Sequence, residues 1–342
     1  MGCERASSDA FLDALDVNEV HWELTNHCNL KCVHCYLSED ERRELSTVEI
    51  KRVMDELYDA GCLALTLTGG EPLLRADFPD LYAYAHSRGF LIHVFTNGTR
   101  ITPKIVALFQ EKPPRVVEIT LNGITAETFE KVTAVEGSFK TCMEGIRRLY
   151  EGGVPLTLKT NGMTLNIAEV LQIKAFAGTM PGVKYKFDTA IMPRRDHDMA
   201  PTQYRLQARE IIALYEDDRV MKKEIKDSCN TWTGQTPVEG AAFQCAAGKA
   251  RFHISAWGDL HPCHTVRPLR VSLHTHSFQE ARTKLRTMVD GVKYPPESKC
   301  GTCKIHLNCA SCPGLAHLEG KSQVLPTAYH CDVAHEVVKT YA

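Results

Sequence analysis

Short runs of apolar and β-branched residues recur along the first two thirds of the chain, separated by longer segments with helical periodicity. Each run ends near Gly, Asn or Asp, as strands do where a loop begins. The predicted strands are Val20–Thr25, Ala64–Thr68, Leu91–Thr96, Val116–Leu121, Leu156–Thr160 and Lys184–Asp188. Strands that alternate with helices in this way form a parallel sheet joined by crossover helices, which is the α/β class.

The helices between these strands are marked by caps and by apolar stripes. Ser46 and Glu49 have the spacing of a capping box, and Thr102 before a proline predicts another helix start. Apolar residues then recur three and four positions apart. This pattern predicts that Cys142, on such a stripe, and Cys62, at the edge of a strand, are core residues.

The periodicity fails between about residues 218 and 245, where the run 230–237 predicts a loop. Beyond this point we expect little regular structure, a weak apolar core and a fold built around metal, because eight cysteines follow residue 221. The chain is therefore divided into a polar leader at 1–17, a parallel α/β unit at 18–220 and a cysteine-rich unit at 221–342.

Length, charge and cysteine content exclude several classes of protein. The chain has 342 residues and a formal net charge of −2, so it can bury a full core and offers no basic surface for nucleic acid or for a membrane. No apolar run has the length of a transmembrane helix. The 14 cysteines have the spacing of metal ligands, and we find no signal peptide, so we expect a reducing cytoplasm rather than a disulfide scaffold.

Three cysteines lie at C-x3-C-x2-C spacing, directly after the first predicted strand: Cys28, Cys32 and Cys35. Three thiolates can hold three corners of a four-iron four-sulfur cube and leave the fourth iron open to a substrate or cofactor. From spacing alone, the alternative is a structural zinc site with His27 or His34 as fourth ligand.

The second predicted strand ends in the run Gly69, Gly70, Glu71 and Pro72. Glycines let the backbone approach a ligand closely, and a carboxylate can hold a cationic amino group. Together with the three cysteines, this run resembles the radical SAM enzymes, over about residues 18–200. The resemblance implies a partial (β/α)6 barrel in which the cysteine loop follows strand one and the Gly-Gly-Glu-Pro run follows strand two.

The resemblance also implies that the three cysteines bind a four-iron four-sulfur cluster, with S-adenosylmethionine (SAM) on its open iron. The residues that it places against SAM lie in the cysteine loop and at the carboxyl ends of the strands: His34, Gly69, Gly70, Glu71, Thr96, Asn97, Thr120, Asn122 and Lys159. Many relatives carry Leu-Asp-Gly at strand four and then an arginine that meets the SAM carboxylate. Here Asn122 replaces the aspartate and Lys131 and Thr133 lie near the arginine position, so Lys159 is a competing candidate.

A second cysteine array resembles the SPASM extension, which binds two auxiliary four-iron four-sulfur clusters. The resemblance implies that the outer cluster is held by Cys300, Cys303, Cys309 and Cys331 and the inner one by Cys245, Cys263 and Cys312. Cys229 is the candidate for the fourth inner ligand, and an inner cluster left open is the alternative. Two residues separate Cys309 from Cys312 where the usual pattern has three. A pair of zinc sites remains the structural alternative.

Four residues are candidates for catalysis. Asp188, Arg194 and Asp196 follow strand six at the barrel mouth, where they could orient substrate or accept a proton, although an internal salt bridge is the alternative. His264 lies next to Cys263.

By this resemblance the chain is an enzyme that cleaves SAM reductively and uses the resulting 5′-deoxyadenosyl radical to abstract a hydrogen from its substrate. We predict a radical SAM oxidoreductase that oxidises or cross-links a peptide or protein side chain, with the inner cluster taking up the electron. Such an enzyme needs an external one-electron reductant such as ferredoxin or flavodoxin, and a peptide substrate is expected to need a separate recognition protein. The alternatives are a dehydrogenase or epimerase acting on a sugar-like small molecule and a non-catalytic iron-sulfur electron-transfer protein.

Overall fold

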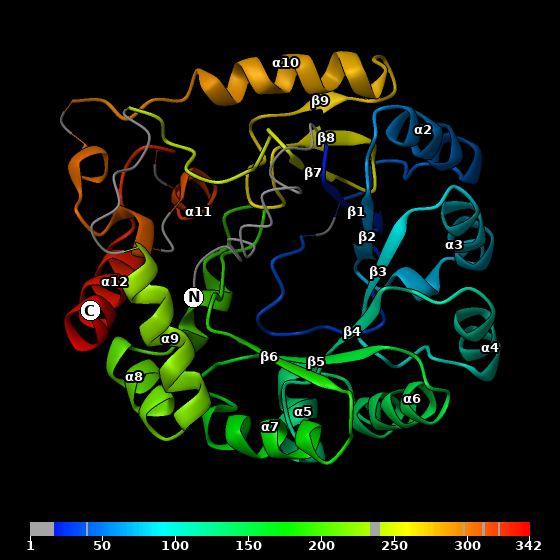
Figure 1. The fold of residues 1–342 in the computed structure, drawn as a ribbon, viewed down its shortest axis with the longest axis horizontal. Coiled ribbons are helices and arrows are strands. Elements are labelled where there is room, and N and C mark those ends of the chain that lie inside the picture. Colours follow the sequence, from blue (N-terminus) through cyan, green and yellow to red (C-terminus); the bar gives the residue numbers. More distant parts are fainter. Residues whose placement is uncertain (1–16, 39, 233–239, 297, 310–311, 321) are drawn as a thin grey trace.

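The computed structural model describes residues 17–38, 40–232, 240–296, 298–309, 312–320 and 322–342. Within these residues, one curved sheet forms an incomplete ring (Figure 1). Its strands are β1 (Glu19–Thr25), β2 (Ala64–Gly69), β3 (Leu91–Thr96), β4 (Val116–Thr120), β5 (Leu156–Asn161), β6 (Lys184–Asp188), β7 (Arg251–Ile254), β8 (Asp259–His261) and β9 (Val271–Ser272). They lie in the order β6-β5-β4-β3-β2-β1-β7-β8-β9, parallel from β6 to β7 and antiparallel at β8 and β9.

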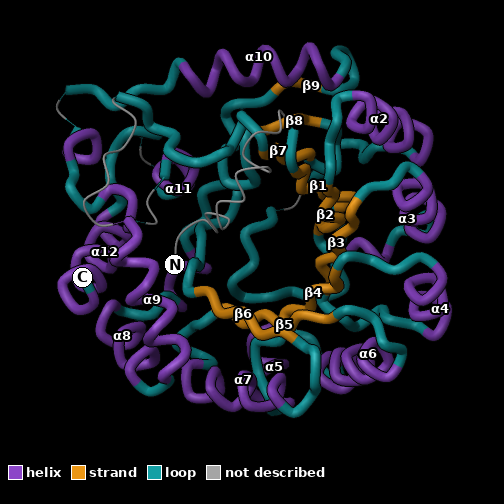
Figure 2. The backbone as a smooth tube through the Cα atoms, in the orientation of Figure 1, coloured by secondary structure: helices purple, strands orange, loops and turns teal. Residues whose placement is uncertain are grey.

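Helices surround the sheet and fill the side of the ring that the strands leave open (Figure 2). The helices that follow β1 to β5 are α2 (Thr47–Asp59), α3 (Phe78–Ser87), α4 (Pro103–Glu111), α5 (Ala126–Thr133), α6 (Ser138–Glu151) and α7 (Val170–Gly178). Those after β6 are α8 (Ala208–Glu216), α9 (Arg219–Trp232), α10 (Phe278–Asp290), α11 (Pro313–Leu318) and α12 (Ala328–Tyr341). Short 3-10 turns are η1 (Pro72–Leu74), η2 (Ile167–Glu169), η3 (Ala200–Tyr204), η4 (Lys299–Thr302) and η5 (His306–Asn308). No helix of the described residues is both long enough and apolar enough to cross a membrane.

The two faces of the sheet differ in polarity. In β1, Trp22 and Leu24 are at most 1% exposed and belong to the main apolar core, together with residues of α2. Because successive side chains of a strand point to opposite faces, Glu23 lies on the inner face of the ring. The ring therefore has an apolar outer layer under the helices and a polar interior.

The fold class expected from the sequence is confirmed. All six predicted strands are present, with bounds within one residue of those expected. The capping box before α2 is formed, since the Ser46 hydroxyl accepts a hydrogen bond from Glu49 N (3.3 Å) and Ser46 N donates to the Glu49 carboxylate (2.8 Å). Thr102 caps α4, and Cys62 and Cys142 are buried in the core.

The expected loop at 230–237 is wrong in its first part, because α9 continues to Trp232. This helix is rich in lysine and acidic residues, so its apolar stripe is narrow. Met221, Ile225 and Cys229 nevertheless recur every four positions and pack into a second apolar cluster with α8 and α12. The rest of that run, and the leader at residues 1–16, lie outside the described residues.

The C-terminal part is more regular than the sequence indicated. β7 pairs with β1 in parallel, so the sheet continues across the predicted division at residue 220, which stays a prediction. α10 begins at a capping box formed by Ser277 and Glu280, and Phe278 and Leu285 join the main core. Several short strands and helices escaped sequence analysis because each carries only a few apolar residues.

Gly145 sets how closely α6 packs on the loop after β3. A Cβ at this position would lie 2.0 Å from the carbonyl oxygen of Gly98. We expect Gly145→Ala to lower the free energy of unfolding by about 1–3 kcal/mol, because the helix must move away. Thermal unfolding of the two proteins measures the effect. Gly178→Ala is the matched control, since nothing lies within 4 Å of its added Cβ; a fall in stability as large in the control would contradict the packing argument.

Candidate functional site

The loop that carries the three cysteines is fastened to the turn after β2 by backbone contacts. Gly70 N donates to the carbonyl oxygen of Thr25 (2.9 Å), and Glu71 N donates to that of His27 (2.8 Å). A Cβ on Gly69 would lie 2.2 Å from the Thr25 oxygen, and one on Gly70 would lie 2.3 Å from the His27 oxygen. Only glycines allow this approach, so the Gly-Gly pair fixes where the cysteine loop begins.

Cys28, Cys32 and Cys35 lie together on this loop, which enters the centre of the ring after β1 (Figure 1). Burial raises the pKa of the Cys32 thiol, and the nearby Cys35 and Cys28 raise it further. The Cys28 sulfur accepts hydrogen bonds from Leu30 N (3.4 Å) and from Asn97 Nδ2 (3.7 Å). Three grouped thiols with N–H donors aimed at a sulfur suit the ligation of an iron-sulfur cluster.

Glu71 is fully buried, and its carboxylate is used inside the protein. It accepts hydrogen bonds from Thr96 Oγ1 (2.8 and 2.9 Å), Asn97 N (2.7 Å) and Leu73 N (3.0 Å). Burial raises its pKa to about 7, against the effect of these donors. The side chain therefore joins the turn after β2 to the end of β3 and positions Asn97 beside Cys28. Its expected contact with the SAM amino group stays a prediction.

Polar residues in or just after three strands, β4, β5 and β6, meet near His34. Asn122 Oδ1 accepts from Asn161 N (2.8 Å), so its Nδ2 is the donor to His34 Nε2 (3.3 Å). Burial and, after it, the charge of Lys159 lower the pKa of His34 to about 4, which keeps the ring neutral. Lys159 Nζ lies 3.8 Å from Asp188 Oδ2. The fold thus brings together four residues that the sequence assigned to SAM or to catalysis.

The other candidates in this part of the barrel are placed as follows. Thr120 ends β4 beside Lys159 of β5. Arg194 Nε lies 3.2 Å from Asp198 Oδ2, and the exposed Asp196 accepts a hydrogen bond from Asp198 N (3.1 Å). These contacts lie within one loop, and the roles proposed for Arg194 and Asp196 stay predictions.

The cysteines of the second array also gather in two groups. In the first, burial raises the pKa of the Cys312 thiol to about 12, and Cys263 and Cys245 are near enough to add to the increase. Burial alone would raise the pKa of Cys263, but the adjacent His264, whose Nδ1 is 3.4 Å from the sulfur, lowers it to about 6. Thr265 Oγ1 also donates to this sulfur (3.6 Å). The setting favours a thiolate, which is the form that binds metal.

The second group lies next to α12. Burial raises the pKa of the Cys300 thiol, and Cys303 and Cys331 raise it further. The Cys309 sulfur donates to the carbonyl oxygen of His330 (3.6 Å), one residue before Cys331. The two groups correspond to the inner and outer ligand sets implied by the sequence, and the assignments themselves stay predictions.

Cys229 lies in α9, buried in the apolar cluster that also contains Tyr215 and Val333. Asn308 Nδ2 donates to its carbonyl oxygen (3.1 Å), which places it near Cys309 of the outer group. Its role as fourth ligand of the inner cluster stays a prediction. Within the described part of the chain, no three His, Cys, Asp or Glu side chains are arranged to hold a single metal ion.

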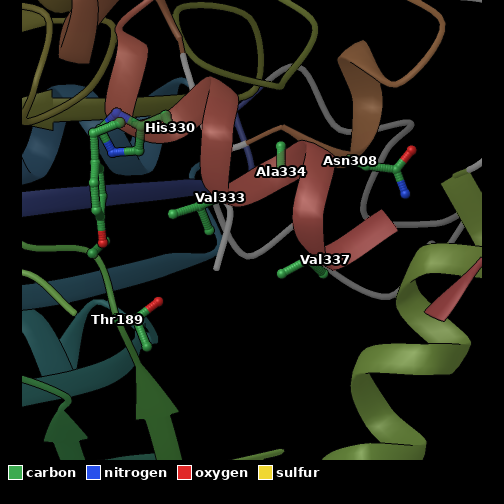
Figure 3. Close-up of a pocket in the computed structure, with 8 residues that line it drawn as sticks. Thr189, Asn308, His330, Val333, Ala334 and Val337 are labelled. Carbon is green, nitrogen blue, oxygen red and sulfur yellow. The ribbon is translucent and has the colours of Figure 1, made fainter. Parts of the chain in front are cut away.

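A shallow pocket opens between the end of β6 and α12. Figure 3 shows Thr189 on one side and Val333, Ala334 and Val337 of α12 on the other. The residues that line it are mostly apolar: Thr189, Ala190, Asn308, Tyr329, His330, Val333, Ala334 and Val337. The pocket therefore borders the outer cysteine group, whose Cys309 and Cys331 neighbour its lining.

Sequence reasoning missed a buried ionic cluster inside the ring. Arg195 forms an ion pair with Glu23, and His253 Nε2 lies 3.4 Å from the other oxygen of the same carboxylate. The Arg195 guanidinium also stacks 5.0 Å from the centre of the Tyr36 ring. One signal was available: a carboxylate at position 23, between two large apolar residues of a central strand, has to face the interior.

A curved parallel sheet, with a three-cysteine loop fastened to a Gly-Gly turn, defines an iron-sulfur enzyme of the partial-barrel class. Residues 22–177 match the family described as the radical SAM superfamily. The chain contains a radical SAM domain and is an enzyme.

Two kinds of curated relative are similar to this chain. The AdoMet-dependent heme synthase of Methanosarcina barkeri is 27% identical over 323 residues, which cover 87% of this chain and 91% of the relative. The mycofactocin maturase of Mycolicibacterium smegmatis is 39% identical over 134 residues, but these cover 39% of this chain and 34% of the relative. The second likeness is therefore local, and the first spans most of both chains.

Solved structures with a bound peptide or bound AdoMet share the fold. Streptococcus suis SuiB bound to precursor peptide SuiA has a TM-score of 0.74 at 14% identity and covers 94% of this chain and 77% of that one. Native anSMEcpe with bound AdoMet has a TM-score of 0.70 at 14% identity, with 94% and 96% covered. These likenesses establish the fold, a radical SAM barrel with a cysteine-rich SPASM-type region, and leave the substrate open.

Removing the Glu71 carboxylate tests its positioning role. Glu71→Ala leaves the Thr96 hydroxyl and the amides of Leu73 and Asn97 without an acceptor, so we expect a loss of about 2–4 kcal/mol in the free energy of unfolding. SAM binding should weaken while iron content is retained. Thermal unfolding, equilibrium SAM binding and iron analysis of anaerobically reconstituted protein measure the three quantities.

The control for this variant is Glu169→Ala. Glu169 likewise accepts hydrogen bonds at a loop, from Ile124 N (2.6 Å), Thr125 Oγ1 (2.7 Å) and Thr128 Oγ1 (2.6 Å). Its loss should lower stability while SAM affinity is kept. Unchanged SAM affinity in Glu71→Ala would contradict the positioning role.

The three cysteine groups predict the iron content. Anaerobic reconstitution should load about twelve irons per chain, and a triple Ala variant at Cys28, Cys32 and Cys35 should lose about a third of them together with all SAM cleavage. Cys62→Ala, which removes a buried core thiol, should keep its iron. Iron and sulfide analysis measures the effect, and tightly bound zinc in place of iron would rule this assignment out.

Proposed function

We propose that this chain is a radical SAM oxidoreductase that oxidises or cross-links a side chain of a peptide or protein. The observation that carries the proposal is the fastening of the cysteine loop to the Gly-Gly turn, which puts three thiols beside the carboxyl ends of the strands. When bound, a reduced four-iron four-sulfur cluster and SAM supply a 5′-deoxyadenosyl radical that removes a hydrogen atom from an unactivated carbon. The chain's own residues position the reactants.

The residues around the cysteine loop have separate tasks. Cys28, Cys32 and Cys35 hold the cluster, and Asn97 donates a hydrogen bond to the first of these sulfurs. The Gly-Gly turn offers backbone carbonyls to the SAM amino group, because the Glu71 carboxylate is already occupied. The neutral His34 offers a buried Nδ1–H, which has no partner among the described residues, to the adenine.

The inner cysteine group supports a net oxidation. After a hydrogen atom is removed, a substrate radical must still lose an electron and a proton. Cys245, Cys263 and Cys312 lie near one another in the C-terminal part, and His264 beside Cys263 favours its thiolate form. In the proposal, these three cysteines would hold an inner cluster, and Cys300, Cys303, Cys309 and Cys331 would hold an outer one. The two clusters would supply a path for the electron to an external carrier of the ferredoxin or flavodoxin type.

A peptide or protein substrate is supported by the relatives. SuiB shares the fold and was solved with its precursor peptide, and part of the chain resembles mycofactocin maturase. In this proposal a separate recognition protein presents the peptide at the barrel mouth.

A second candidate substrate is a carboxylate-bearing tetrapyrrole. Two observations favour it: the relatives that align over most of this chain are named heme synthases, and Arg195 and Arg267 have buried guanidinium donors without a partner among the described residues. A porphyrin carries carboxylates that arginines recognise well.

The electron-acceptor role is tested by removing one inner ligand. Cys263→Ala should abolish the oxidised product but leave 5′-deoxyadenosine measurable, because radical generation needs only the first cluster. Mass spectrometry should show the loss of two hydrogens per event in a peptide incubated with the unaltered enzyme. The matched control is Cys142→Ala, a buried core thiol that lies in no cysteine group. Full turnover by Cys263→Ala would remove the electron-acceptor role.

A further inference from the structure

We propose that Arg195 and Arg267 bind a carboxylate group of the substrate inside the ring, between Cys35 and Cys263. The inference rests on the proposed function, since it names the chemistry of that enzyme's substrate. It is carried by the hydrogen-bonding groups that the protein buries there and leaves without partners.

Arg195 is held in place but only partly satisfied. Its side chain is 5% exposed, and Nη2 forms the ion pair with Glu23. Its Nε and Nη1 are buried and have no hydrogen-bond partner among the described residues, and the same holds for Nη1 of Arg267. A buried donor without an acceptor costs free energy, so these groups point to an acceptor that arrives with a ligand.

Two other arginines of the chain find hydrogen-bond acceptors for their guanidinium groups within the protein. Arg75 donates to Asp77 and to the carbonyl oxygens of Leu24 and Leu45. Arg205 donates to the carbonyl oxygen of Ile191 and to Glu319. Arg75 and Arg205 thus have hydrogen-bond acceptors within the protein. The donors of Arg195 and Arg267 that lack an acceptor are therefore a local property of this region and not a general feature of the fold.

The charges of Arg195, Arg267 and their neighbours favour an anionic ligand. Burial and, after it, the repulsion of Arg195 lower the pKa of Arg267 to about 10, which still leaves it a cation at neutral pH. Burial also lowers the pKa of His253 to about 3, so this neighbour is neutral. Arg195 pairs with Glu23, and no carboxylate of the described residues forms an ion pair with Arg267. A carboxylate from a ligand would supply that partner, and guanidinium is the cation best suited to bind it.

The position of Arg195 in the protein suits substrate binding. Burial raises the pKa of the Cys35 thiol, and Arg195 is close enough to oppose this rise; Arg195 also packs on Tyr36. The Tyr36 ring lies 5.5 Å from that of His264, which neighbours Cys263. A carboxylate bound here would hold its molecule between the group that generates the radical and the group proposed to take the electron.

The test is a comparison of binding by anaerobically reconstituted holoenzyme. The first pair of probes is Fe-coproporphyrin III and its methyl ester, and the second is a short glutamate-rich peptide and its glutamine counterpart. We expect one carboxylate probe to bind more tightly than its neutral partner, by a factor on the order of 10 to 100. The pair that shows the preference identifies the source of the carboxylate.

Arg267→Gln should remove most of this preference. Arg270→Gln is the matched control, because Arg270 is 56% exposed and lies 3.8 Å from Asp259, and it should keep the preference. Arg195→Gln alone would strand the buried Glu23 carboxylate, so it is combined with Glu23→Gln, and this double variant should also lose the preference. SAM affinity should be unchanged in Arg267→Gln.

Two results would overturn the inference: no carboxylate preference in either pair, or a preference that survives in both Arg267→Gln and the double variant. Unchanged probe binding with a shifted midpoint potential of the inner cluster would overturn it as well, because the arginines would then serve the cluster's charge. Formation of 5′-deoxyadenosine without any probe reports separately on the proposed function, so its failure is distinguishable from failure of the carboxylate site.

Discussion

The site depends on two backbone hydrogen bonds, from Gly70 N and Glu71 N to the carbonyl oxygens of Thr25 and His27. They join the loop after β1 to the turn after β2 at a distance that excludes any side chain on the glycines. Glu71 extends the connection, because its buried carboxylate holds the end of β3, and Asn97 there reaches the Cys28 sulfur. These hydrogen bonds connect the carboxyl ends of β1, β2 and β3. The position of the cysteines is therefore set by the sheet rather than by their own loop.

This arrangement requires an unusual interior. Parallel sheets generally bury apolar residues on both faces. Here the inner face carries ionised pairs such as Glu23 with Arg195, and Glu118 with Lys186 (3.0 Å). Charges withdrawn from water cost free energy that pairing only partly offsets. The apolar layer under the helices, with residues such as Trp22, Leu67 and Val94 at 0% exposed, supplies the stability that the polar interior does not.

Periodicity was enough to predict the six-stranded core, and cysteine spacing was enough to find the C-x3-C-x2-C loop, because both signals are local in the sequence. The two groups of the second array came from the resemblance to the SPASM extension. The failures have physical causes. α9 was missed because its many charges hide a narrow apolar stripe, and β7 because a four-residue strand has no pattern of its own. Glu23 and Arg195 are 172 positions apart, and no local signal connects them. Glu71 could be located from its motif, but its burial and its four hydrogen bonds needed the fold.

Fold and substrate are determined by different residues. The chain shares its fold with SuiB, which was solved with a precursor peptide, at 14% identity, while relatives named heme synthases align with it over most of its length. A scaffold that serves such different molecules cannot itself select among them. The helix-facing side of each strand is occupied by the core, and the cysteine loop is occupied by the chemistry common to the class. Selection is left to the inner-face residues that neither task uses. In this chain, Arg195 and Arg267 have buried donors without a hydrogen-bond partner among the described residues.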